Sequence, residues 1–566
     1  MENIVLEKYN KWRNYLKTNN EAEYHKLKSI TSQDYLYDLF YKDLEFGTGG
    51  LRGIMELGSN RFNKYNVYKA TRGYGNYLLS KFERPSVVIG FDSRNNSQNY
   101  AKIAANVLLN LGIKVYLFSK LIPTPIVSYA IRLLKANGGI IITASHNPKE
   151  YNGYKVYNYN GGQITLSEAN LILEEINKID ALEEYIKFSE CTNNESLVEI
   201  YDAVLNSFIS STLKTSVLKD FSNKNIKIVY TPLNGTGLVP VLNTLKNAGF
   251  HEIVVPKKQE QPDGNFPTCP YPNPELKEAL KLGVEECNKT NSDLLLATDP
   301  DCDRCGVGVR YKDRFVLLNG NEIATLLLQF LIETKKCDGK EIVRSIVSTS
   351  IVDKIASENN INVKKVLTGF KFIGEEINNL EQNGKLNDFL FGFEESYGYL
   401  TNTEVRDKDA VNACLLISEM FYFYYKQNIN LIEKLNSIYI RYGYCKNKLI
   451  THTFNGPSGI IKMNMIISNI RKASFERLNK LFGLEVVEVE DYLNSKSISK
   501  ECNKIIDLPK SNVIIVRFKH DVSIILRPSG TEPKLKCYLE AINKNSQDAC
   551  DIIEHLEGVF LTLIKS

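Results

Sequence analysis

The sequence predicts an α/β protein with three similar mixed-sheet domains and a smaller C-terminal α+β domain. Three observations support this. The chain has 566 residues, whereas single hydrophobic cores rarely extend past about 300 residues. The order strand, polar turn, helix, strand occurs three times, at intervals of about 110–140 residues, and this order is typical of βαβ units. Short strands lie close together near the C-terminus, followed by one helix.

The first repeat begins with the apolar run 87–92, which is expected to be a buried strand. A polar turn at Ser93 and Arg94 leads to a helix expected from Ser97 to about residue 111, and a second strand is expected over 114–118. The same order is expected in the second repeat, with strands 226–230 and 252–255 around the turn 235–237 and a helix ending near 247. It is expected again in the third repeat, with strands 341–347 and 363–367 around the turn 348–350 and a helix ending near 357.

The segments outside these repeats complete the division into domains. Residues 1–45 and 195–213 show apolar positions at helical spacing, and the second of these segments is expected to bridge the first two domains. The C-terminal domain is expected to contain three strands and one helix, over 513–518, 522–526, 534–542 and 548–563. We place the four domains at 1–205, 206–314, 315–437 and 438–566.

Composition excludes several classes of partner. The formal net charge is +4 and no long basic run occurs, so nucleic-acid binding is not expected. No run of about 18 apolar residues and no signal peptide is found, so we expect no membrane partner and a cytoplasmic location. The 11 scattered cysteines fit reduced thiols. Neither a second pair nor a nearby histidine accompanies Cys302 and Cys305, so no zinc site is predicted.

The first chemical motif is Thr-Ala-Ser-His-Asn-Pro at 143–148, directly after the apolar run 139–142. It places the hydroxyl of Ser145 at the end of a strand, where functional loops lie. His146 follows the serine and Lys155 lies ten residues on, so a nucleophile has two candidate groups for proton transfer or charge stabilisation. The alternative is an ordinary turn in which Ser145 caps a helix.

The second motif is Asp-Pro-Asp-x-Asp-Arg at 299–304, after the apolar run 294–297. Three crowded carboxylates are unfavourable unless a cation joins them, and three carboxylates leave room for water or phosphate oxygen, which suits Mg²⁺. A calcium EF-hand is excluded, because its sixth position requires glycine and holds Arg304, and its twelfth requires glutamate and holds Arg310. The alternative is a solvated acidic turn.

Four further stretches are weaker when each is taken alone. The glycine-rich stretch 47–53 carries Arg52 and could bind an anion. Lys371 follows Gly369 at the end of a predicted strand and could meet a phosphate. Gly-Phe-Glu-Glu-Ser-Tyr-Gly at 392–398 offers carboxylates and a hydroxyl suited to sugar hydroxyls, and Arg-Pro-Ser-Gly-Thr-Glu-Pro at 527–533 offers a phosphate cradle. Asp409 is expected to cap a helix.

As a set and in this order, these motifs resemble those of the α-D-phosphohexomutase superfamily over nearly the whole chain. The sequence Gly-Phe-Glu-Glu-Ser-Tyr-Gly-Tyr is most similar to the phosphoglucomutase-2 and phosphopentomutase branch. The resemblance implies four domains around a central cleft. The first would carry a phosphoserine loop, the second a metal-binding loop, the third a sugar-binding loop and the fourth a phosphate-binding loop.

The resemblance also implies roles for single residues. Ser145 would be the phosphoserine, and Asp299, Asp301 and Asp303 would bind Mg²⁺ together with an oxygen on Ser145. The other catalytic residues implied are Arg52, Arg304, His146, Lys155 and Lys371, of which the last three are candidates for the general base. The substrate-binding residues implied are Thr48, Gly369, Glu394, Ser396, Arg527, Ser529, Gly530, Thr531 and Lys536.

The activity implied is an isomerase that interconverts glucose 1-phosphate and glucose 6-phosphate through glucose 1,6-bisphosphate. Pentose phosphates and mannose phosphate are alternative substrates, because the loops recognise phosphate and hydroxyls without measuring the ring. The alternatives from different classes are a metal-dependent glycosyltransferase and a non-catalytic phosphoprotein. The expected partner is a small sugar phosphate, and the expected state is a monomer or a small homo-oligomer.

Overall fold

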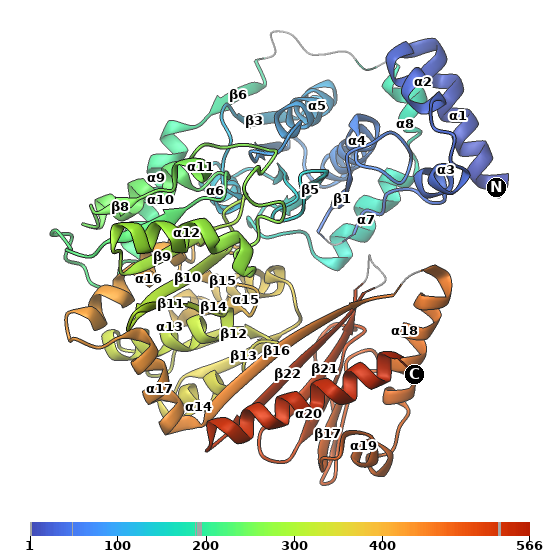
Figure 1. The fold of residues 1–566 in the computed structure, drawn as a ribbon. Helices are drawn as coiled ribbons and strands as arrows, with labels where there is room; N and C mark the ends of the chain where they lie inside the picture. Colours follow the sequence, from blue (N-terminus) through green and yellow to red (C-terminus); the bar gives the residue numbers. More distant parts are fainter. Residues whose placement is uncertain are drawn as a thin grey trace. The chain divides into compact units, whose positions relative to one another are not determined.

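A computed structural model of the chain describes residues 3–47, 49–186, 188, 195–454, 456–529 and 534–565 (Figure 1). The side chains of residues 456 and 457 are not described. The chain forms two compact units. The first contains residues 1–320, 373–389 and 396–423, and the second contains residues 321–372, 390–395 and 424–566. Among the described residues, no helix has the length and apolar character needed to span a bilayer.

The first unit begins with three helices, as the helical spacing in residues 1–45 predicts. Asn20 and Ser32 cap the second and third helices by accepting backbone N–H bonds. The three helices enclose a small core in which Trp12 makes edge-to-face contacts with Phe40 and with Tyr65. The bounds are Asn3–Asn19 for α1, Glu21–Lys28 for α2 and Gln33–Phe40 for α3.

A six-stranded mixed sheet follows, in the order β1-β5-β4-β2-β3-β6. Its central strands are parallel, and β5 pairs antiparallel with β4 and with β1. The predicted first repeat is confirmed as β2, α5 and β3. The strands are β1 (Leu51–Ile54), β2 (Ser86–Phe91), β3 (Lys114–Phe118), β4 (Gly138–Ile142), β5 (Tyr151–Asn158) and β6 (Leu197–Ile200); the helices are α4 (Lys64–Lys81), α5 (Ser97–Asn110), α6 (Thr124–Leu133), α7 (Leu166–Asn177) and α8 (Ala181–Tyr185).

One sequence prediction is wrong in this region. Residues 195–213 were expected to form one helix, but the segment contains β6 and then most of α9 (Asp202–Lys214). Leu197 to Ile200 pair in parallel with Val115 to Phe118 of β3. The edge of the sheet therefore outweighs the helical spacing of this short segment, because tertiary pairing overrides local propensity.

The second sheet of the first unit has five strands in the order β11-β10-β9-β7-β8. β7 pairs in parallel with β8 and β9, whereas β10 pairs antiparallel with β9 and β11. The second predicted repeat is confirmed as β7, α10 and β8. The strands are β7 (Ile228–Thr231), β8 (Ile253–Val254), β9 (Leu294–Thr298), β10 (Cys305–Tyr311) and β11 (Arg314–Leu318); the helices are α10 (Leu238–Asn247), α11 (Lys257–Glu260) and α12 (Lys277–Thr290).

The second unit contains the third predicted repeat, which is confirmed as β12, α14 and β13. β12 (Glu341–Ser345) pairs in parallel with β13 (Asn362–Val366) and neighbours β14 (Phe389–Glu394). The helices before and after β12 are α13 (Gly320–Thr334) and α14 (Ile351–Glu358). Further along the chain, after β13, come α15 (Phe370–Gln382), the 3₁₀ turn Leu386–Asp388, β15 (Gly398–Leu400) and α16 (Ala410–Tyr425). Most residues of these later elements belong to the first unit.

The C-terminal part is a seven-stranded antiparallel sheet in the order β16-β22-β21-β20-β17-β18-β19. The long helix α20 lies along one face of this sheet (Figure 1). The predicted strands and final helix are confirmed as β20, β21, β22 and α20. The strands are β16 (Tyr444–Thr453), β17 (Val486–Asp491), β18 (Lys496–Ser499), β19 (Asn503–Ile505), β20 (Ile514–Phe518), β21 (Val522–Pro528) and β22 (Lys534–Asn543); the helices are α17 (Leu431–Tyr442), α18 (Gly456–Arg471), α19 (Phe475–Phe482) and α20 (Ser546–Lys565).

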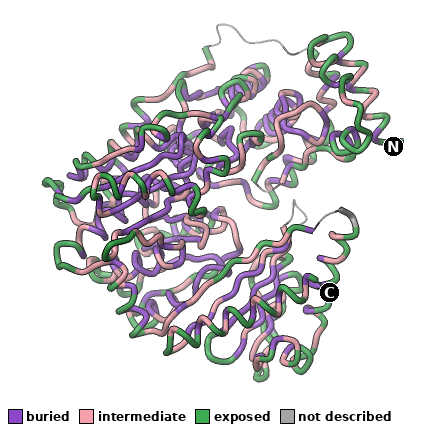
Figure 2. The backbone as a smooth tube through the Cα atoms, in the orientation of Figure 1, coloured by how far each residue is buried: buried purple, intermediate pink, exposed green. Residues whose placement is uncertain are grey.

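Buried residues follow the central strands of the sheets, and exposed residues follow the outer faces of the helices (Figure 2). Strands β4 and β9 are buried at every position. Both strands end in the loops that carry the strongest predicted motifs. A rigid buried strand therefore precedes the predicted nucleophile and the predicted metal ligands.

Candidate functional site

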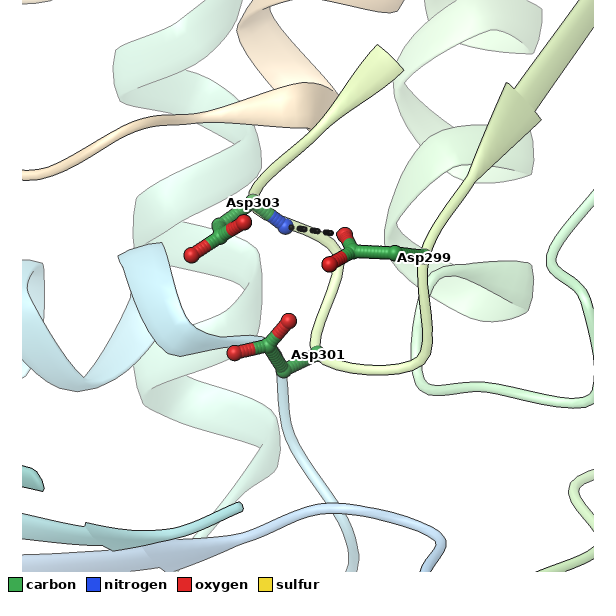
Figure 3. Close-up of side chains that lie close together, drawn as sticks. All are labelled: Asp299, Asp301 and Asp303. Carbon is green, nitrogen blue, oxygen red and sulfur yellow. Dashed lines mark hydrogen bonds between the residues drawn. The ribbon is translucent and has the colours of Figure 1, made fainter. Parts of the chain in front are cut away.

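The aspartate loop follows β9 and buries three carboxyl groups together. Asp299, Asp301 and Asp303 are at most 2% exposed, and one oxygen of each lies within 4.8 Å of the others (Figure 3). The backbone N–H groups of Asp303 and Arg304 donate to Asp299 Oδ1 at 3.1 and 3.0 Å, which fixes the turn. Among the described residues, this is the only group of acidic, cysteine or histidine side chains close enough to share a metal ion.

The donor set fits a hard divalent cation. Asp301 Oδ1 and Asp303 Oδ1 are buried and have no hydrogen-bond partner among the described residues. Unpaired buried carboxylate oxygens are costly, and Mg²⁺ prefers oxygen ligands of this kind. Burial, together with the charges of Asp301 and Asp303, holds the pKa of Asp299 well above its usual range. These three residues could therefore bind Mg²⁺, which would remove their mutual repulsion.

Ser145 lies beside this carboxylate group although 154 residues separate it from Asp299. Its Oγ donates to Asp299 Oδ2 at 2.7 Å, and its side chain is buried. Ser145 has a positive φ of 52°, and its N–H donates to Thr143 Oγ1 at 2.8 Å. A non-glycine residue in the left-handed region is uncommon and often marks a functional turn. The fold therefore turns the serine hydroxyl towards the aspartates.

His146 also contacts the serine hydroxyl. Its Nδ1 is 3.1 Å from Ser145 Oγ. Burial and the positive charges of Arg304 and Arg52 hold the pKa of His146 well below its usual range. The imidazole is therefore neutral at pH 7, and a neutral ring can accept a proton from a neighbouring hydroxyl.

Two lysines neutralise the carboxylates. Lys155 Nζ lies 2.8 Å from Asp301 Oδ2 and 3.3 Å from Asp303 Oδ2. Lys408 Nζ lies 3.1 Å from Asp303 Oδ2. Burial opposes ionisation of Asp301, but the charge and hydrogen bond of Lys155 and the charge of Lys408 hold its pKa below its usual range. For Lys155, burial lowers the pKa, but Asp301 and Asp303 raise it above the usual value, so this lysine carries a positive charge at pH 7.

Sequence reasoning missed the role of Lys408. The stretch Arg406-Asp407-Lys408-Asp409 predicts a helix start, and the one signal in it for a buried ionic network is the alternation of charges before an apolar helix. The expected cap is confirmed, because Asp409 Oδ1 accepts the N–H groups of Val411 at 2.9 Å and Asn412 at 3.0 Å.

Arginines surround the serine loop. Arg52 Nη1 donates to Asn147 Oδ1 at 3.0 Å, in the loop that carries Ser145. Arg304 pairs with Glu275, and its buried Nε has no hydrogen-bond partner within the described part of the chain and lies 3.9 Å from Asp303 Oδ1. The structure therefore brings both predicted arginines to the serine and aspartate loops.

Arg94 is a second residue that sequence reasoning missed. Its guanidinium is fully buried and donates to the carbonyl oxygens of Pro148 at 2.8 Å, Tyr151 at 3.2 Å and Ser145 at 2.5 Å, and also to that of Asn147. Its Nε lies 3.4 Å from Asp92 Oδ2. One arginine thus holds the serine loop through several carbonyl groups. Its only sequence signal was a polar pair directly after a buried strand.

The remaining predicted residues lie mainly in the second unit. Glu394 is buried and its Oε1 accepts the N–H of Gly369 at 2.6 Å. Lys371 Nζ lies 4.8 Å from the ring centroid of Phe372. Ser396 belongs to the first unit.

In the predicted phosphate-binding stretch, Arg527 of β21 lies opposite Lys536 of β22 in the antiparallel register. The N–H of Ser529 donates to the carbonyl oxygen of Lys534 at 2.7 Å. Thr48, Gly530 and Thr531 lie outside the described residues.

Comparison with known protein families identifies all four parts of the chain. Three alpha/beta/alpha domains of the phosphoglucomutase/phosphomannomutase family, domains I, II and III, match residues 43–183, 206–312 and 319–442. The C-terminal domain of the same family matches residues 477–550. The predicted resemblance and the predicted four-domain architecture are therefore confirmed.

Relatives named phosphoglucomutase agree with these matches. The phosphoglucomutase of Staphylococcus haemolyticus is 35% identical over 553 residues, which cover 97% of this chain and 99% of the relative. The phosphoglucomutase of Staphylococcus aureus strain USA300 is 37% identical over 519 residues, which cover 91% of this chain and 92% of the relative.

Two solved structures share the fold at low sequence identity. A phosphoglucomutase/phosphomannomutase family protein from Burkholderia thailandensis has a TM-score of 0.65 at 18% identity, covering 91% of this chain and 96% of its own. Parafusin, a phosphoglucomutase from Paramecium, has a TM-score of 0.64 at 19% identity, covering 92% of this chain and 95% of its own.

Proposed function

The chain belongs to the phosphoglucomutase/phosphomannomutase family, and we propose that it interconverts glucose 1-phosphate and glucose 6-phosphate. The proposed route uses a phosphoserine at residue 145 and a glucose 1,6-bisphosphate intermediate. One observation carries the proposal: the buried hydroxyl of Ser145 lies 2.7 Å from a carboxylate of a three-aspartate group suited to a divalent cation. Relatives of nearly the same length bear the name phosphoglucomutase, which supports glucose phosphates as substrates.

We propose Asp299, Asp301 and Asp303 as the protein ligands of Mg²⁺, together with an oxygen on Ser145. The bound cation would neutralise negative charge on the phosphoryl oxygens. Asp301 Oδ1 and Asp303 Oδ1, which are buried and accept no hydrogen bond from a described residue, support this assignment. The two lysines hold the aspartates together, and Lys155 also brings a positive charge that can face a phosphoryl group.

In the proposed reaction, the bond between phosphorus and Ser145 Oγ breaks as a bond forms between phosphorus and a substrate hydroxyl oxygen. The hydroxyl proton passes to a base on the protein, and Ser145 Oγ leaves as an oxyanion that must be protonated or neutralised. In the second step a bond forms between Ser145 Oγ and the phosphorus of the other phosphate, as the bond between that phosphorus and the sugar oxygen breaks and the sugar oxygen takes up a proton. His146, whose Nδ1 lies 3.1 Å from Ser145 Oγ, is one of the candidates for this base, beside Lys155 and Lys371. Arg52 and Arg304 would steady the transferring group by charge.

The remaining residues are proposed to bind the substrate. Glu394 and Ser396 would bind ring hydroxyls, and Lys371 would neutralise phosphate charge or transfer a proton. The other proposed contacts are Thr48 and Gly369 for the substrate, and Arg527, Ser529, Gly530, Thr531 and Lys536 for the phosphate that does not react. Because the bisphosphate must present both ends in turn, this cradle has to recognise phosphate rather than sugar. We propose the domain limits given above, 1–205, 206–314, 315–437 and 438–566, as the four parts that carry these loops.

Turnover of the purified protein on glucose 1-phosphate, with Mg²⁺ and a trace of glucose 1,6-bisphosphate, tests the proposal. Parallel assays with ribose 1-phosphate and mannose 1-phosphate identify the preferred sugar. Ser145→Ala is the matched variant, since it keeps the loop and removes only the hydroxyl. Turnover by the wild type and none by Ser145→Ala is the expected result. No turnover on any of the three sugars, with Ser145 shown to be phosphorylated, would refute the proposal.

A further inference from the structure

A second glutamate, Glu395, follows Glu394 and forms hydrogen bonds with two serines. Glu395 Oε2 accepts the hydroxyl groups of Ser345 at 3.1 Å and Ser348 at 3.2 Å. The backbone N–H of Glu395 donates to Ser348 Oγ at 3.0 Å. Ser348 therefore contacts both the side chain and the backbone of Glu395. We call these three residues the Glu395 clamp.

The serines of the clamp are themselves held rigidly. The two serine hydroxyls lie 2.8 Å apart. Arg344 Nη1 donates to the carbonyl oxygens of Ser345 and Ser348, each at 3.0 Å. The same guanidinium binds both carboxylate oxygens of Asp353 at 2.7 Å, and Arg344 is buried. A bidentate pair between an arginine and a carboxylate has a specific geometry. Arg344 and Asp353 therefore hold the backbone of the two serines in place between the end of β12 and the start of α14.

The clamp borders the proposed hydroxyl-binding carboxylate. Glu394 is 4% exposed, and its Oε1 accepts the N–H of Gly369 at 2.6 Å. Its side chain is therefore fixed at one end by Gly369, and its backbone is fixed at the next residue by Ser348. A carboxylate held at both ends has little freedom, which is the condition for orienting substrate hydroxyls without a further loss of entropy.

The same acidic pair lies near the phosphate-binding strands. In the register of β21 and β22, Ile525 pairs with Tyr538 and Arg527 with Lys536, so these four side chains share one face of the sheet. Tyr538 packs with Ile346 and Val347, the residues between the two clamp serines. Burial, with the negative charge of Glu395, raises the pKa of Tyr538, whereas Arg527 lowers it. Tyr538 of the phosphate-binding strands therefore lies near both Glu395 of the clamp and Arg527.

We propose that Glu395 is a positioning residue, which together with Ser345 and Ser348 fixes the backbone that carries Glu394. This inference rests on the proposed function, because Glu394 is assigned there to the ring hydroxyls. Glu394 would contact those hydroxyls in the ground state and in the transition state alike. Loosening the clamp is therefore expected to raise KM with little change in kcat, which is the signature of lost uniform binding.

Steady-state kinetics of Ser348→Ala on glucose 1-phosphate provides the functional test. We expect KM to rise about tenfold, the equivalent of one lost hydrogen bond to a charged group, and kcat to stay within about twofold. Ser357→Ala is the control, because Ser357 is exposed on the neighbouring helix α14. Glu395→Gln keeps an acceptor oxygen and is expected to raise KM less than Glu395→Ala.

A double variant separates positioning from general loss of structure. If the clamp acts through Glu394, then Ser348→Ala added to Glu394→Gln is expected to raise KM no further than Glu394→Gln alone. Fully additive effects, or an unchanged KM in Ser348→Ala, would overturn the proposed role of the clamp in binding.

Amide hydrogen exchange tests the clamp independently of activity. In Ser348→Ala, peptides containing the N–H groups of Glu395 and Gly369 are expected to exchange at least about tenfold faster, and in Ser357→Ala they are expected to match the wild type. Unchanged exchange rates in Ser348→Ala would refute the proposal that the clamp fixes this backbone, whatever the kinetics show. A wild type without turnover would instead refute the proposed function, and the exchange result would still decide whether the clamp exists.

Discussion

Replacing Arg94 by lysine is expected to damage the serine loop while keeping its positive charge. Arg94 donates to carbonyl oxygens of Ser145, Asn147, Pro148 and Tyr151 from one planar group. A lysine ammonium is a single point with three donors on a flexible stem, so it cannot reach these carbonyls in the same fork geometry. The charge beside the buried Asp92 is preserved, so the variant isolates the geometric contribution.

The expected loss follows from these contacts. A hydrogen bond from a charged donor contributes about 1.5–3 kcal/mol. The lysine is expected to keep some of the four bonds, and the loss of one or two of them lowers the free energy of unfolding of the first unit by about 1.5–6 kcal/mol. Ser145 holds a positive φ of 52°, and this conformation depends on the contacts around it. A displacement of about 1 Å at a reacting atom can lower kcat by about 100-fold.

Thermal unfolding and turnover on glucose 1-phosphate measure the two effects. Arg84→Lys is the matched control, because Arg84 is exposed. We expect Arg94→Lys to lower both Tm and kcat and Arg84→Lys to change neither. Wild-type Tm and kcat in Arg94→Lys would refute the reasoning that this guanidinium shapes the serine loop.

Three further predictions concern the charges of the site. Lys155→Met leaves Asp301 and Asp303 with less neighbouring positive charge and is expected to lower the free energy of unfolding by about 3–5 kcal/mol. The measurement is the Tm in the presence of a metal chelator, and an unchanged Tm would contradict the prediction. Chelation of divalent cations is expected to abolish turnover, and Mg²⁺ at 100 times its Kd to stabilise the protein by about 2.7 kcal/mol, a gain that Asp303→Asn is expected to lose. Burial raises the pKa of Asp409 from 3.8 to about 7, so the folded state binds more protons between these values and stability falls as pH rises. The Tm of Asp409→Asn minus the Tm of the wild type is therefore expected to be more positive at pH 8 than at pH 5. The same difference at both pH values would contradict this prediction.

The serine and aspartate loops were predictable because each follows a fully buried apolar strand. The runs ending at Ile142 and Thr298 are apolar enough to be recognised as strands, and the polar residues directly after them had to lie at strand ends. The order of the motifs then indicated the family and its four domains, which the comparisons confirm. Local sequence was sufficient wherever a functional residue and the strand that positions it are neighbours in the chain.

Residues that act over long sequence distances were not predictable in this way. Arg94 reaches the serine loop from a turn about 50 residues earlier, and Lys408 reaches Asp303 from more than 100 residues later. In neither case does the local sequence indicate which distant residue the side chain contacts. The strand β16 was missed for a different reason: its sequence, Tyr-Cys-Lys-Asn-Lys-Leu-Ile-Thr-His-Thr, is largely polar and only Cys445 in it is buried, so it shows no apolar run. Its long antiparallel pairing with β22 stabilises it instead.

The central claim is that Ser145 carries the phosphoryl group between substrate and product. Incubation of dephosphorylated protein with glucose 1,6-bisphosphate labelled on phosphorus, followed by peptide mass spectrometry, tests it most directly. We predict one labelled phosphate on the peptide containing Ser145, its transfer to added glucose 1-phosphate, and neither event in Ser145→Ala. Label on a different residue, or full turnover by Ser145→Ala, would contradict the account.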